Sequence, residues 1–120
     1  FINLNVSAAF HSFLMKDAQN SLNKNIQNTK FTNSSISIIS NFSGKLANNV
    51  DEIINNLSNQ MSNRVRWVES IQNLEKINEN KVIEIGPGKV LTGLIKRISN
   101  NFDISNIEYV TDIEKIKNEI

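Results

Sequence analysis

A short apolar run, Val-Ile-Glu-Ile at residues 82–85, is followed at once by Gly86-Pro87-Gly88. Glycine and proline interrupt regular structure, so this junction predicts a strand that stops at a tight turn. Apolar residues then recur at three- and four-residue steps, as one face of an amphipathic helix requires. They are Val90, Leu91, Leu94, Ile95 and Ile98. A buried strand that turns directly into a helix is typical of α/β folds with a mainly parallel sheet.

Three further strands are predicted. The first covers residues 2–6, where isoleucine, leucine and valine alternate with asparagine. The second covers residues 36–39 and ends at the turn-forming residues 41–44, in which Asn41 is expected to bond its own backbone. The third covers residues 107–110. Strands that alternate with helices support an α/β architecture, and no internal repeat or linker marks a boundary within the chain.

Helices are predicted between these strands, at positions marked by residues that cap helices. Ser12 and either Asn48 or Asn49 can each accept a hydrogen bond from the first turn of a following helix. Another helix is predicted from about Arg66, and the residues from Asp112 onwards form a weak amphipathic pattern.

The composition excludes several classes of protein. The formal net charge of +1 gives no broad attraction to nucleic acid or to an anionic membrane. The chain has no cysteine and one histidine, so it offers neither a disulfide framework nor a metal-ligand cluster. No apolar run approaches the roughly 20 residues that span a bilayer, and the first residues lack the basic start of a signal peptide. We therefore expect a cytoplasmic protein that binds no metal.

His11 is a candidate catalytic base. It follows the predicted strand at residues 2–6, in a loop of small residues. The end of a parallel strand is where α/β folds place catalytic groups. An imidazole there can take a proton from a serine hydroxyl and return it to the leaving group. The simpler interpretation is a histidine that is satisfied by one backbone hydrogen bond, and His11 alone does not exclude it.

The Gly86-Pro87-Gly88 turn also permits two interpretations. A glycine-rich turn before a helix exposes backbone N–H groups that suit a phosphate or nucleotide, as in the cofactor loop of Rossmann-like methyltransferases. Those enzymes usually need another glycine after Gly88, whereas this chain continues with Lys89. The alternative is a purely structural turn.

The strongest indication of function comes from four segments taken together. They are AFHSFLM at residues 9–15, LSNQM at 57–61, RVRW at 64–67 and EIGPGKVLTGLIKRI at 84–98. In this order and spacing they resemble the C-terminal part of the malonyl-CoA:acyl carrier protein transacylases. The chain departs from that family at Lys16-Asp17 and at Arg64, where the family usually has proline; these changes affect turns and not the histidine.

The resemblance implies the C-terminal part of an α/β-hydrolase-like core with a mainly parallel sheet. Residues 1–6 would be the last strand of, or the link from, a small ferredoxin-like subdomain, and residues 7–120 would belong to the large subdomain. The catalytic serine, the arginine that pairs with the malonyl carboxylate and the oxyanion-hole donors would lie upstream. These 120 residues contain no Gly-x-Ser-x-Gly motif, so we expect them to be inactive alone.

The resemblance also implies roles for individual residues. His11 would be the general base, and Gln60 would orient it, chiefly through its backbone carbonyl. Phe10 resembles the residue that selects malonyl over methylmalonyl. Lys89, Lys96 and Arg97 would contact the carrier protein or the phosphates of coenzyme A, although an ordinary solvated helix face explains them equally well; Trp67 is expected to pack in the core.

The implied reaction transfers malonyl from a coenzyme A thioester, with no bound cofactor, through an acyl-serine to acyl carrier protein. It would serve fatty-acid biosynthesis, and the full-length enzyme would be a monomer. Three alternatives remain open: a methyltransferase that binds its cofactor at Gly86 to Gly88, a non-enzymatic α/β interaction module, and the acyltransferase domain of a polyketide synthase.

Overall fold

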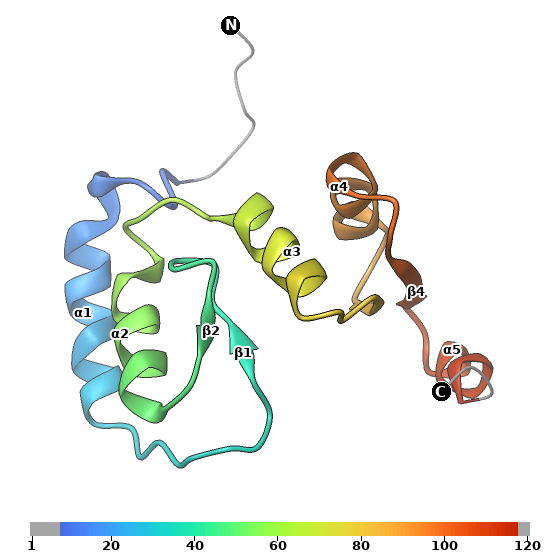
Figure 1. Cartoon of the computed structure of the whole chain (residues 1–120). Helices are drawn as coiled ribbons and strands as arrows, with labels where there is room; N and C mark the ends of the chain where they lie inside the picture. The colour runs from blue at the N-terminus through green and yellow to red at the C-terminus, as the bar shows by residue number, and fades with distance from the viewer. Residues whose placement is uncertain (1–7, 118–120) are drawn as a thin grey trace, which may run out of the picture. The chain divides into compact units, whose positions relative to one another are not determined.

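The computed structural model describes residues 8–117 and divides the chain into two compact units, Phe1–Ser70 and Ile71–Ile120. Helices and short strands follow one another in both units, which confirms the α/β class (Figure 1). The strand predicted for residues 2–6, and the assignment of residues 1–6 to a ferredoxin-like subdomain, lie outside the described residues.

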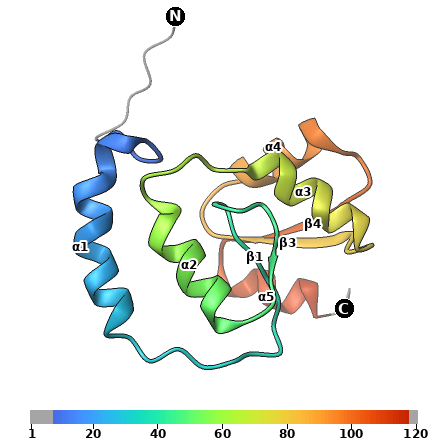
Figure 2. The same cartoon turned by 60° about the vertical axis from the view of Figure 1, so that its left-hand side comes forward.

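The first unit is built around two helices that pack against each other (Figures 1 and 2), α1 (Lys16–Gln27) and α2 (Val50–Gln60). Ser12 is a helix cap, but of a short turn and not of α1 as predicted: its hydroxyl oxygen accepts a hydrogen bond of 3.3 Å from the backbone N–H of Leu14. The residues directly after it form a 3-10 turn, η1 (Phe13–Met15), and the α-helix begins only at Lys16.

Asn49, and not Asn48, caps α2. The Asn49 side-chain oxygen accepts a hydrogen bond of 2.9 Å from the N–H of Glu52, and the Glu52 carboxylate accepts one of 2.6 Å from the N–H of Asn48. This reciprocal arrangement is a capping box shifted by one residue, and it satisfies backbone donors that the first turn leaves free.

A small antiparallel sheet completes the first unit. Strands β1 (Ile38–Ile39) and β2 (Leu46–Ala47) pair with Ile38 opposite Ala47 and Ile39 opposite Leu46. The sequence predicted a longer β1 and did not predict β2, because two residues are too few to display an alternating pattern.

The turn at residues 41–44 joins β1 to β2 and anchors the start of α3 (Trp67–Lys76). The carbonyl of Asn41 accepts a hydrogen bond of 2.8 Å from the N–H of Arg66, and the carbonyl of Phe42 accepts one of 3.1 Å from Arg66 Nε. The predicted turn is therefore present, and two of its backbone carbonyls bond Arg66, which is distant in the sequence.

The second unit runs through β3 (Lys81–Ile85), α4 (Val90–Ile98), β4 (Asp103–Ile107) and α5 (Val110–Ile116). The two strands are parallel, with Lys81 opposite Asp103 and Ile85 opposite Ile107, so α4 is the crossover of a βαβ unit. The strand–turn–helix predicted around residues 82–98 is confirmed.

The strand predicted at residues 107–110 is wrong. The strand lies earlier and ends at Ile107, and Val110 is the first residue of α5. The Asp112 carboxylate accepts hydrogen bonds from the N–H groups of Tyr109 at 2.9 Å and Glu108 at 3.2 Å. These bonds fix a helix N-terminus at a point where β-branched residues alone would favour a strand.

The predicted apolar faces are buried in part. The buried apolar residues of the first unit are Ile26 and Ala47, and those of the second are Ile71, Ile95 and Ile116. In contrast, Phe13 and Val90 are exposed by 79% and 69%. Periodicity therefore identified the helices correctly, but only some positions of each apolar face pack within the described residues.

Candidate functional site

His11 lies in the turn before η1 and has a left-handed backbone, with φ of 63°. This region costs a residue with a Cβ about 1–2 kcal/mol, so surrounding contacts must hold it. Its N–H donates a hydrogen bond of 2.9 Å to the carbonyl of Met61, and the Ser12 hydroxyl donates one of 2.7 Å to the carbonyl of Ala9. An unfavourable conformation held in place this way is typical of functional sites.

The imidazole of His11 is oriented by two backbone carbonyls. Nδ1 lies 3.1 Å from the carbonyl oxygen of Gln60 and 3.2 Å from that of Asn63. Carbonyl oxygens only accept hydrogen bonds, so Nδ1 must carry the proton in the neutral ring. Nε2 is then the basic nitrogen, and the side chain is exposed. The arrangement suits a general base whose tautomer is fixed by its partners.

Gln60 meets His11 through its backbone, as the sequence resemblance implied. Gln60 also lines an apolar cavity of about 230 Å³ in the first unit, together with Ile38, Ile53 and Leu57. The second carbonyl on the ring, from Asn63, was not anticipated; a backbone acceptor leaves no signal in the residue type.

Phe10 directly precedes His11 and is 56% exposed. An exposed ring next to the candidate base can meet a substrate that approaches Nε2, so its predicted role in acyl selection stays open.

Trp67 is half-buried, and its indole Nε1 is buried without a hydrogen-bond partner among residues 8–117.

The turn at Gly86-Pro87-Gly88 is tied to the chain itself. Asn106 donates a hydrogen bond of 2.9 Å to the Gly88 carbonyl, and the Gly86 N–H donates one of 2.9 Å to Ile107. Gly88 has φ of 78°, a conformation that glycine adopts without strain.

A carboxylate of the chain occupies the N-terminus of the helix that follows. Glu84 is 8% exposed, and its carboxylate accepts hydrogen bonds from the N–H groups of Leu91 and Thr92 and from the Thr92 hydroxyl, at 2.9, 2.8 and 2.6 Å. The Thr92 hydroxyl contributes most to a lowered Glu84 pKa, and the two N–H groups add to this effect against the opposing effect of burial. These N–H groups are therefore not available to a phosphate.

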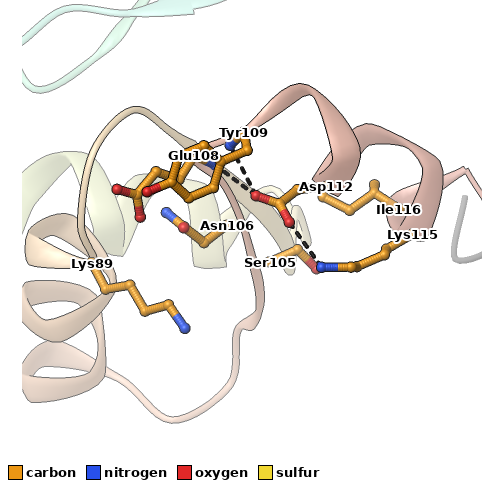
Figure 3. A pocket seen from close by; sticks show the side chains of 8 residues that line it. All are labelled: Lys89, Ser105, Asn106, Glu108, Tyr109, Asp112, Lys115 and Ile116. Carbon is orange, nitrogen blue, oxygen red and sulfur yellow. Dashed lines mark hydrogen bonds and ion pairs between the residues drawn. The ribbon is translucent and has the colours of Figure 1, made fainter.

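The candidate basic residues are not gathered in one place. Lys89 precedes α4, whereas Lys96 and Arg97 lie in its last turn, about 10 Å further along the helix axis. Lys89 lines an open pocket of about 510 Å³ in the second unit, on which Glu108, Asp112 and Lys115 also lie (Figure 3). Lys115 donates to Asp112 at 3.0 Å, and two carboxylates balance the two ammonium groups, so this pocket does not favour anions by net charge.

Sequence reasoning missed two buried polar side chains that make hydrogen bonds important to the fold, although each left a signal. Glu84 is a lone charge within an apolar strand, and Gln19 stands on the same helical face as Leu22 and Ile26. Both side chains are buried and hydrogen-bonded. A polar residue that interrupts an apolar pattern is therefore informative in this chain.

Across residues 8–117, no group of three or more histidine, aspartate or glutamate residues is placed to hold a metal ion. Within the same residues, no helix has the length and apolar character needed to cross a membrane.

The chain was compared with known proteins, and no family model matches it. It is 34% identical over 113 residues to a malonyl-CoA:acyl carrier protein transacylase of Synechocystis, covering 94% of this chain and 39% of that protein. It is 41% identical over 102 residues to a polyketide-biosynthesis malonyl-CoA:acyl carrier protein transacylase of Bacillus velezensis, covering 85% of this chain and 35% of that protein.

The structural comparison agrees. A malonyl-transacylase solved in complex with its type II polyketide-synthase acyl carrier protein has a TM-score of 0.86 and 31% identity, covering 96% of this chain and 38% of that one. The chain thus spans less than two fifths of the length of these relatives.

Proposed function

Because the chain matches a fragment of the malonyl-CoA:acyl carrier protein transacylase family, we propose that the protein containing it transfers malonyl from coenzyme A to acyl carrier protein. The observation that carries the proposal is the His11 imidazole, whose Nδ1–H is held by the carbonyls of Gln60 and Asn63. This arrangement leaves Nε2 as a base for a nucleophilic hydroxyl.

The reaction proceeds in two half-reactions with the same histidine. In the first, Nε2 of His11 takes the proton of a serine supplied by another part of the protein, the serine oxygen attacks the thioester, and coenzyme A leaves as the thiol. In the second, the phosphopantetheine thiol of the carrier protein gives its proton to Nε2 and attacks the acyl-serine; the bond from the acyl carbon to the serine oxygen breaks, and the imidazolium returns the proton to that oxygen. The imidazolium formed in each step donates to two neutral carbonyls, so Gln60 and Asn63 act as orienting acceptors in place of a carboxylate.

The fold of the complete protein is part of the proposal. We assign these residues to the C-terminal part of an α/β-hydrolase-like core with a mainly parallel sheet. The parallel β3–β4 pair supports this assignment. Ile85, Val90 and Val110 are exposed by 77%, 69% and 81%, a level that is unusual for apolar residues that flank a sheet, and we propose that the rest of the protein covers them.

The substrates and partners follow the same reasoning. A coenzyme A thioester is the acyl donor, no bound cofactor is required, and acyl carrier protein is the acceptor, as in the related complex. Phe10 is proposed to favour malonyl by crowding an α-methyl group. Lys89, Lys96 and Arg97 are candidate contacts for phosphates or for the acidic carrier protein. A cytoplasmic monomer is the expected form.

Two alternatives differ in their support. A role in polyketide biosynthesis shares all of this chemistry, and one of the relatives carries that description. A methyltransferase is disfavoured by Glu84, whose carboxylate already occupies the N-terminus of α4.

The proposal is tested with the complete protein, purified and supplied with labelled malonyl-CoA and phosphopantetheinylated acyl carrier protein. We expect label on the carrier protein and a stable malonyl-enzyme when the carrier is omitted. Absence of both, together with saturable binding of adenosylmethionine, would replace the transacylase with the methyltransferase interpretation.

A further inference from the structure

Gln19 is a buried polar residue of α1 whose side chain reaches the end of α2. It is 3% exposed, the value of a core residue. Its side-chain oxygen accepts a hydrogen bond of 2.7 Å from the N–H of Met61, and its side-chain nitrogen donates one of 3.3 Å to the carbonyl of Leu57. A second bond from the same nitrogen, 2.7 Å to Asn23 Oδ1, comes from within α1.

These contacts replace a bond of the helix itself. In a regular α-helix the N–H of Met61 would donate to the carbonyl of Leu57, four residues earlier. At the ends of α4 and α5, the C-cap N–H does donate to a carbonyl of its own helix. At α2 the carboxamide of Gln19 is inserted between donor and acceptor and bonds both. Met61 N–H can only donate and Leu57 C=O can only accept, so the orientation of the Gln19 amide is fixed by its partners.

The residues at this opened turn are the ones that hold His11. The carbonyl of Met61 accepts the N–H of His11 at 2.9 Å, and the carbonyl of Gln60 accepts Nδ1 at 3.1 Å. Gln19 bonds the N–H of the peptide that carries the Gln60 carbonyl, because that peptide unit joins Gln60 to Met61. Rotation of this peptide would turn the Gln60 carbonyl away from the ring.

We propose that Gln19 is a positioning residue for His11. Its carboxamide takes the place of the last helical hydrogen bond of α2 and fixes the Gln60–Met61 peptide, and through it the Nδ1–H tautomer of the imidazole. The catalytic importance of Gln19 rests on the proposed function. Its effect on the tautomer of His11 is independent of that function.

The test uses the complete protein with Gln19→Met, which keeps the length of the side chain and removes both hydrogen-bonding groups. Nitrogen-15 NMR of the imidazole, assigned with a His11→Asn variant, reports which ring nitrogen carries the proton. We expect the Nδ1–H tautomer in the wild type and a mixture containing the Nε2–H form in Gln19→Met. The rate constant of acyl-serine formation should fall about ten- to hundredfold, as for a modest misplacement of a catalytic group.

Two controls separate positioning from stability. Asn23→Ala removes the hydrogen bond that Gln19 makes within α1, and it leaves the two bonds to α2 intact. Ile26→Val weakens the apolar core at α1. Both variants should keep the wild-type tautomer. Gln19→Glu retains an acceptor for Met61 N–H and should show a smaller change in the same direction, which covers the case in which Gln19→Met does not fold. A wild-type tautomer in the Gln19 variants would overturn the proposal. If the wild-type protein showed no transfer activity, the proposed function would be refuted. The proposed effect of Gln19 on the tautomer would stand, because the tautomer is measured without substrate.

Discussion

Gly44 is the position where a single methyl group should disturb the site from a distance. It lies in the turn between β1 and β2 with φ of 66°. A Cβ added there would lie 3.0 Å from the Cβ of Glu69 and 3.2 Å from that of Arg66. Carbon atoms normally approach to about 3.5–4.0 Å, so the start of α3 or the turn must move.

The expected loss of stability for Gly44→Ala combines three effects. The left-handed backbone costs alanine about 1–2 kcal/mol, and the two close contacts cost about 1–3 kcal/mol as overpacking. The lower entropy of the unfolded alanine chain returns about 0.4–1 kcal/mol. We therefore expect the free energy of unfolding to fall by about 1–5 kcal/mol.

The assay is urea denaturation of the complete protein, followed by tryptophan fluorescence and circular dichroism. Ser43→Ala is the matched control, because the Ser43 hydroxyl makes only long bonds of 3.3 and 3.4 Å to Lys45 and should change the free energy by less than about 1 kcal/mol. A loss below about 1 kcal/mol for Gly44→Ala, with an unchanged denaturant slope, would refute the steric reasoning. Transfer activity should also fall, since the turn anchors Arg66 and with it the segment that carries the Asn63 carbonyl.

The remaining predictions concern specificity and acid stability. Phe10→Ala should raise the ratio of kcat/KM for methylmalonyl-CoA over malonyl-CoA by about tenfold or more, the usual value of one methyl group in a pocket; an unchanged ratio would remove Phe10 from acyl selection. Hydrogen bonds lower the Glu84 pKa below its ordinary value of 4.5, so they stabilise the fold above that pH and less as the pH falls. Glu84→Gln should therefore lower the urea midpoint at pH 7 and flatten its decline below pH 4.5; an equal decline in both proteins would contradict the capping role. The N–H of Tyr109 and the Lys115 ammonium lower the Asp112 pKa from 3.8 to about 2, so the ionised Asp112 stabilises the fold above pH 3.8, and this contribution is lost as the pH falls to about 2. Asp112→Asn should therefore lower the urea midpoint at neutral pH and reduce the fall of that midpoint between pH 3.8 and 2.

The sequence predicted the helices well because their signals are local. Asn49 caps α2 through a side chain three residues from its partner, and the apolar spacing after Gly88 is repeated over two turns. The strands were harder to predict. Strand β2 is two residues long, and the last strand was misplaced because Asp112 turns Val110 into the start of a helix. Pairing between strands depends on partners that a local pattern does not contain.

The candidate site was predictable only in part from the sequence. The resemblance named His11 and the backbone carbonyl of Gln60, but the second acceptor on the ring, the carbonyl of Asn63, came only from the structure. Backbone groups exist at every residue, so only the fold selects them. Gln19 and Glu84 carried a readable signal, a polar residue on an apolar face, whose meaning required the structure.

The most direct test of the central claim is single-turnover formation of the malonyl-enzyme by the complete protein and by its His11→Ala variant, followed by rapid quenching and intact mass. We predict a malonyl adduct in the wild type and a rate constant lower by about 10²- to 10⁴-fold in the variant, the usual contribution of a general base. Equal rates in the two proteins would show that His11 is not the base and would contradict the mechanism.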